Sequence, residues 1–191
     1  MQTPQEFITA LDSLRGQKFR PELHVVQIPP PTHIAPWTVA LQAEVNTSSD
    51  LDPEFYLGEA KFVVLHDPQG QPAWNGNFRV VVHAKAPMDS ELAGDPLLGE
   101  VAWSWLAESL DHQGASFHTL GGTVTRVFNE TFGGLTLGTS KVELELRASW
   151  TPHTEYLTEH LLGWADFAAK LAGLGPWEEN VSSLRRKVET I

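Results

Sequence analysis

The chain has 191 residues, with 13 Lys and Arg against 24 Asp and Glu, a formal net charge of −11 and no cysteine. This length fits a single domain that buries enough apolar surface to fold by itself, and the missing thiols exclude a cysteine nucleophile, a disulfide scaffold and a cysteine-based metal site. The negative charge argues against nucleic acid or an anionic membrane as a partner, since both require a cationic face.

The N-terminal residues show no targeting signal, because no basic segment is followed there by an apolar one. The apolar runs of the chain are far shorter than the about 20 residues that cross a bilayer. We therefore expect a cytoplasmic protein.

The first half of the chain predicts one helix followed by strands. The helix spans residues 3–16, where Thr3 and Glu6 form the pattern of a capping box around Pro4 and apolar residues recur at helical spacing. A short extended piece precedes three prolines that favour polyproline II. Alternating apolar and polar residues then predict three antiparallel strands with intervening turns: strands 37–45, 58–65 and 78–85, turns 66–70 and 75–76.

The second half predicts further helices around two strands. A helix begins at Asp95-Pro96, with Leu97 and Val101 in its apolar stripe. We predict an α+β fold, in the order α-βββ-α-ββ-α-α, with helices on one face of an antiparallel sheet of five to six strands. Residues 1–191 form a single domain, and residues 176–191 an appended C-terminal helix. The other predicted elements are strands 123–132 and 142–150 and a helix that follows 151–152.

The eight histidines show no spacing typical of a metal site, and no serine lies in a nucleophile motif. We therefore assign no catalytic residue, no metal and no cofactor. His66 and His83 lie on neighbouring predicted strands beside Asp67, so they form either an acid/base or metal pair or ordinary strand histidines. Residues 133–140 have the glycine spacing of a phosphate loop, but Thr139 replaces the required lysine, which favours a turn.

Four charged residues are the candidate polar site. Glu143, Glu145 and Arg147 alternate along one face of a predicted strand, and Arg126 lies on the neighbouring one. One interpretation is a ladder of cross-strand charge pairs. The others are a pair of carboxylates suited to glycoside hydrolysis and a recognition face in which the two arginines bind a carboxylate or phosphate.

Two of the seven tryptophans fall outside the predicted apolar stripes. Trp74 lies in a loop, and Trp103 lies on the outer side of its helix. Exposed aromatic side chains often anchor protein interfaces, so both are candidate binding residues.

Six motifs in order resemble an actinobacterial family, the domain of unknown function number 3000, from Thr3 to about Gly173. This resemblance implies no catalytic residue. The predicted order of elements is also similar to type III secretion chaperones and YbjN-like domains, which are small acidic dimers that hold partner polypeptides; the three prolines and the appended helix depart from that pattern. The motifs are Val64-Leu65-His66-Asp67-Pro68, Asp95-Pro96-Leu97-Leu98, Trp103-Ser104-Trp105, Gly122-Thr123-Val124-Thr125-Arg126, Phe132-Gly133-Gly134 and Arg147-Ala148-Ser149-Trp150-Thr151-Pro152.

The sequence thus favours a non-enzymatic protein-binding or chaperone-like adaptor module. Its partner is another protein or a second copy of the chain, bound through a sheet face or an exposed edge. The alternative is a small-molecule enzyme or ligand carrier with a polar site around Arg126, Glu143, Glu145 and Arg147 on the sheet face.

Overall fold

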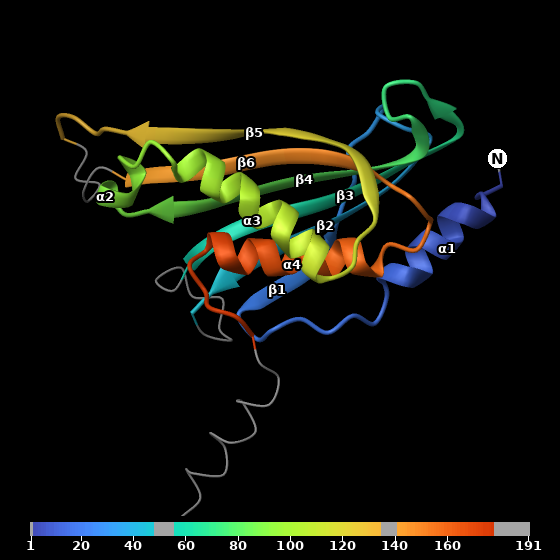
Figure 1. Ribbon diagram of the computed structural model, residues 1–191, viewed down its shortest axis with the longest axis horizontal. Coiled ribbons are helices and arrows are strands. Elements are labelled where there is room, and N and C mark those ends of the chain that lie inside the picture. The colour runs from blue at the N-terminus through green and yellow to red at the C-terminus, as the bar shows by residue number, and fades with distance from the viewer. Residues whose placement is uncertain (1, 48–55, 135–140, 178–191) are drawn as a thin grey trace, which may run out of the picture.

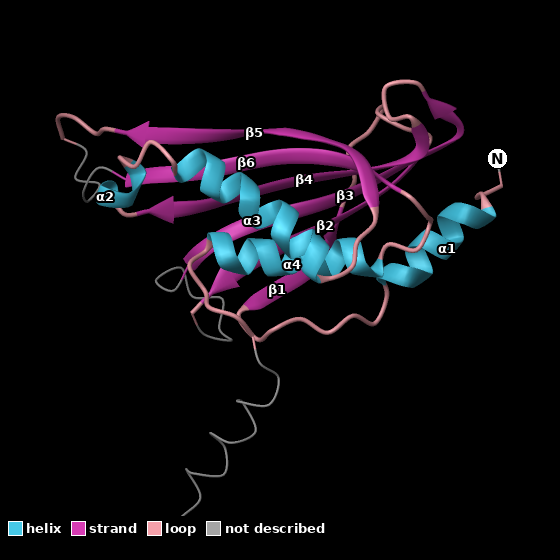
Figure 2. Cartoon of the chain, viewed as in Figure 1, coloured by secondary structure: helices cyan, strands magenta, loops and turns pink. Residues whose placement is uncertain are grey.

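A computed structural model describes residues 2–47, 56–134 and 141–177. These residues form a six-stranded antiparallel sheet in the order β1-β2-β3-β4-β6-β5, and the helices lie on one of its faces (Figures 1 and 2). The predicted α+β class is confirmed. The strands are β1 (Leu23–Ile28), β2 (Trp37–Asn46), β3 (Tyr56–Gln71), β4 (Gly76–Met88), β5 (Phe117–Asn129) and β6 (Lys141–Pro152), and the helices are α1 (Gln5–Leu14), α2 (Ser90–Ala93), α3 (Leu98–His112) and α4 (Thr158–Leu171).

Strand register assigns each side chain to one of two faces, because alternate residues of a strand point in opposite directions. In the β4–β6 pair, Val82 lies opposite Ala148 and His83 opposite Arg147. Val82 and Ala148 are buried under the helices, whereas His83 and Arg147 belong to the opposite face, which no helix of the described residues covers (Figure 1). We call this second face the open face; its charged and histidine side chains include Glu44, Glu59, Lys61, His83, Lys85, Glu143, Glu145 and Arg147.

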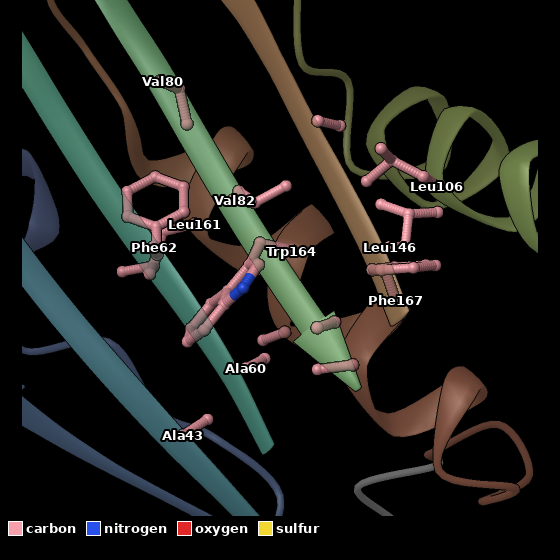
Figure 3. Packing of buried hydrophobic residues seen from close by; sticks show 14 of the residues in the cluster. Ala43, Ala60, Phe62, Val80, Val82, Leu106, Leu146, Leu161, Trp164 and Phe167 are labelled. Carbon is pink, nitrogen blue, oxygen red and sulfur yellow. The ribbon is translucent and has the colours of Figure 1, made fainter. Parts of the chain in front are cut away.

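The hydrophobic core lies between the sheet and helices α3 and α4 (Figure 3). Trp164 of α4 packs against Phe62 of β3, with ring centroids 5.5 Å apart. Trp150 of β6 is fully buried, and its indole N–H donates to Nδ1 of buried His160, 3.0 Å away. The alternating apolar residues of the strands therefore supply one wall of the core, and the helix stripes supply the other.

Helices α3 and α4 pack closely against each other at Gly163. A Cβ atom added there would lie 2.9 Å from Leu110 Cδ2, 3.0 Å from Leu110 Cα and 3.2 Å from Ser109 O. Such distances force the two helices apart, since the neighbouring atoms include backbone.

We expect Gly163→Ala to lower the free energy of unfolding by about 1–3 kcal/mol, although alanine favours the helix. Gly99 of α3 is the matched control, because a Cβ there meets open space. Gly99→Ala should raise the free energy of unfolding by up to about 1 kcal/mol. Urea denaturation of both variants measures the difference, and equal stabilities would contradict the close contact at Gly163.

Several predicted boundaries are wrong because tertiary contacts override local signals. The capping box does not form: Pro4 is the N-cap of α1, and the Glu6 carboxylate instead accepts from Asn77 Nδ2 at 2.8 Å. Strand β3 continues through the predicted turn at 66–70, and the chain reverses at 72–75.

The strand and helix boundaries of the second half differ for the same reason. Strand β5 begins earlier than predicted, at Phe117, because Phe117 pairs with Pro152 of β6. Helix α4 begins only at Thr158, where the Leu157 N–H donates to the Ser13 hydroxyl. Most of the predicted helix 176–191 and part of the glycine-rich loop at 133–140 lie outside the described residues.

Candidate functional site

Two of the four candidate polar residues, Glu145 and Arg147, form a hydrogen-bonded ladder with His83 on the open face. His83 Nε2 donates to Glu145 Oε1 at 2.7 Å, and Arg147 donates to the same oxygen through Nη2 at 2.6 Å and Nε at 2.9 Å. The hydrogen bond from His83 and, less strongly, the bonds and charge of Arg147 hold the pKa of Glu145 below its ordinary value. The Glu145 carboxylate is therefore already engaged by His83 and Arg147 of its own sheet.

The rest of the open face is organised in the same way. Lys85 Nζ lies 3.5 Å from Glu59 Oε1. Near the end of the sheet, burial and the nearby Glu59, Glu143 and Glu44 raise the pKa of Tyr56 to about 12. Glu143 therefore contributes to an acidic neighbourhood around a neutral phenol, while Glu145 is bonded to His83 and Arg147. This pattern matches the charge ladder that the sequence offered as one interpretation.

The predicted clamp of two arginines does not exist. Arg126 pairs with Leu144 across the β5–β6 register, so it lies on the helix face, whereas Arg147 lies on the open face. The Arg126 guanidinium donates to the carbonyl oxygens of Ala93 at 3.0 Å and Pro96 at 3.4 Å. Arg126 therefore ties the segment between α2 and α3 to β5. The sequence did carry a signal for this placement: Arg126 lies two residues after Val124 and two residues before Phe128, so the three side chains share one side of the strand.

The structure also separates His66 from His83. His66 is fully buried between Phe7 and Phe78, with ring centroids at 5.9 and 4.2 Å, and its Nδ1 lies 3.1 Å from the Asn77 carbonyl. His83 lies on the opposite face of the sheet, so the proposed acid/base or metal pair is wrong. Burial lowers the pKa of His66 below its ordinary value.

The two candidate tryptophans are less available than predicted. Trp74 is only 8% exposed, and its carbonyl accepts from the Thr151 hydroxyl, so its prediction as an exposed residue is wrong. Trp103 is half-buried, and a Cβ added to Gly122 of β5 would lie 2.8 Å from its ring. Trp103 thus packs helix α3 onto β5. A role for either side chain in binding a partner stays a prediction.

Strand β5 is a long sheet edge that pairs only with β6 among the described residues. Its 13 residues contain no proline and one charged residue, Arg126, whose guanidinium is turned inward. The other edge, β1, has six residues and runs into Pro29, Pro30 and Pro31, which lack N–H donors. Prolines and short edge strands prevent unwanted pairing, whereas a long uncharged edge favours it.

Exposed apolar side chains lie beside one end of this edge. Phe128 is the last residue but one of β5; Leu92 belongs to α2, Leu97 directly precedes α3, and Val101 lies in its first turn. These four side chains are between 40% and 64% exposed. The bonds from Arg126 to Ala93 and Pro96 hold these segments together. We call these four residues the apolar shoulder. The sequence had assigned Leu97 and Val101 to the apolar stripe of their helix, but both are exposed; the buried members of that stripe include Leu98, Ala102, Leu106 and Leu110.

Two adjoining cavities, of about 530 and 150 Å3, lie near the C-terminal ends of α3 and α4. Both are lined by Arg20, Gln113, Asp166 and Trp177. The Arg20 guanidinium bonds to Glu22 and to the Gly175 carbonyl, and Gln113 bonds to Asp166. The polar groups shared by the cavities are therefore already partnered by the protein itself.

The described part of the chain holds no cluster of three histidine, aspartate or glutamate side chains placed to bind a metal ion. Within the same residues, no helix combines the length and the apolar character that crossing a membrane requires.

Comparison with known proteins gives one match. A family model described as a protein of unknown function (DUF3000) matches residues 3–182. Neither the curated proteins nor the solved structures contain a match to the chain.

Proposed function

Since the chain belongs to the DUF3000 family of proteins of unknown function, we propose its function from the site: it is a non-enzymatic protein-binding module that pairs with a polypeptide strand along β5. The observation that carries this proposal is the outer edge of β5 beside the apolar shoulder: it has no partner strand among the described residues, carries no charge other than Arg126, and is regular from residue 121 to residue 129. Main-chain hydrogen bonds along such an edge supply affinity, and side-chain contacts beside it supply selectivity.

The arrangement of the candidate polar residues supports a binding function in preference to a catalytic one. Glu145 accepts hydrogen bonds from both His83 and Arg147, and Arg126 lies on the other side of the sheet. A general acid or base has to reach a substrate proton, and an anion clamp needs converging donors. The similarity to secretion chaperones stays a prediction.

The test places two lysines on the proposed binding edge. Thr123 and Thr125 are exposed on β5, so Thr123→Lys/Thr125→Lys adds charge with little expected change in folding stability. Val26→Lys, on the exposed part of β1, is the matched control at the other edge. We expect immobilised wild-type protein to retain a defined polypeptide from its own cells, or a differently tagged copy of itself, and the β5 variant to retain at least tenfold less. Equal retention by all three proteins would contradict the proposal.

A further inference from the structure

We infer that the polypeptide bound at β5 is the β5 strand of a second copy of this chain, in a two-fold symmetric dimer. This inference rests on the proposed function, because it uses the same edge and names its occupant. In such a dimer the two β5 strands run antiparallel about an axis perpendicular to the sheet, and a single sheet continues through both copies.

Charge restricts where two copies can approach each other. Each copy carries a net charge of −11, so contact between acidic surfaces is repulsive. Strand β5 contains no aspartate or glutamate, and the positive charge of Arg126 is held by the Ala93 and Pro96 carbonyls. A second copy therefore meets main-chain donors and acceptors there without opposing carboxylates on the strand.

Symmetry pairs the regular part of β5 with itself. A β-bulge interrupts the strand before Gly121, so regular pairing extends over residues 121–129, with Thr125 in the middle. With Thr125 on the axis, Phe128 of one copy lies opposite Gly122 of the second copy, and both belong to the helix face of the sheet. The apolar shoulder of each copy then lies beside this part of the other copy's β5. The rotation keeps the two faces of the sheet distinct, so both α3 helices lie on the same side.

The available area reaches the size that a specific dimer needs. The regular part of β5, residues 121–129, is about 30 Å long, and an edge about 10 Å thick gives about 300 Å2 per copy. The flank of the 15-residue α3, about 22 Å long and about 10 Å thick, adds about 220 Å2. The two copies together would bury about 1,000 Å2, which is about the lower limit for a specific interface.

The first experiment measures mass in solution by light scattering or sedimentation over a range of protein concentrations. One chain has a mass of 21.1 kDa, so we expect a species of about twice that mass for the wild type and for Val26→Lys. Thr123→Lys/Thr125→Lys places four lysines around the axis, and we expect its dimer dissociation constant to rise at least tenfold.

The second experiment uses the absence of cysteine in the chain. A residue on the axis lies opposite its own copy, with Cβ atoms about 4.5–5.5 Å apart, close to what a disulfide spans after small movements. We expect Thr125→Cys to give a covalent dimer under mild oxidation, and Val26→Cys to stay uncross-linked. Equal cross-linking at both edges would overturn the inference.

The outcomes separate the inference from the proposed function. A wild type that stays monomeric at about 100 μM overturns the dimer, and β5-dependent retention of a different polypeptide then preserves the proposed function. A dimer that survives Thr123→Lys/Thr125→Lys uses another surface and also overturns the inference. If β5 variants change neither self-association nor retention, both ideas fail.

Discussion

Acidification from pH 6.5 to about 4 is expected to lower the free energy of unfolding by about 3 kcal/mol through His160 alone. This side chain is 3% exposed, and burial lowers its pKa to about 4, while the charges of Glu159 and His153 act in opposite directions. Its Nδ1 accepts the indole N–H of Trp150, a bond that a proton on Nδ1 removes.

The direction of this pH effect follows from comparing the protonation of His160 in the unfolded and the folded protein. The unfolded chain binds a proton at His160 near pH 6.5, and the folded protein resists that proton until about pH 4. The stabilisation is therefore complete above pH 6.5, falls between these values, and is lost below about pH 4. Burial lowers the pKa of His66 as well, so that core histidine acts in the same direction.

Urea denaturation at several pH values between 7 and 4 tests this expectation. His160→Gln keeps an acceptor for Trp150 but does not titrate, so its free energy of unfolding should depend less on pH than that of the wild type. His112→Gln replaces an exposed histidine of α3 and should keep the wild-type slope. Parallel pH profiles for the wild type and His160→Gln would contradict the assignment.

Gly122→Ala is expected to lower the free energy of unfolding by about 3 kcal/mol and to loosen the β5 edge. A Cβ atom there would overlap the carbonyl oxygen of Arg147 and lie 2.9 Å from Ala148 Cα and 2.8 Å from the Trp103 ring. Two of these neighbours are backbone atoms of β6, so β5 has to move away from its partner strand.

The adjacent glycine provides the control. A Cβ on Gly121 meets nothing within 4 Å, so Gly121→Ala should stay within about 0.5 kcal/mol of the wild type. Amide hydrogen exchange localises the effect, because Gly122→Ala should speed exchange along β5 and β6 before it affects β2 and β3. Equal stability of the two variants would show that β5 does not approach β6 this closely at Gly122.

Much of the candidate site was beyond what the sequence could predict. Arg126 and Arg147 were placed together because their strands were expected to be neighbours, and the strands are neighbours. The register, however, puts the two side chains on opposite faces, and a shift of one residue would have reversed this outcome. Leu97 and Val101 fit a buried helical stripe by spacing, yet which residues of such a stripe are covered depends on how the helix packs in the fold.

Local patterns in the sequence were enough to determine the α+β class, the helix and strand content and the apolar face of β6, because these depend on residues two to four positions apart. The order β4-β6-β5 joins segments that are distant in the chain, and it is this order that makes β5 an edge. Only the tertiary structure decided that a strand of β-branched and aromatic residues has no partner on its outer side among the described residues, since pairing energy depends on long-range register and not on the strand's own composition.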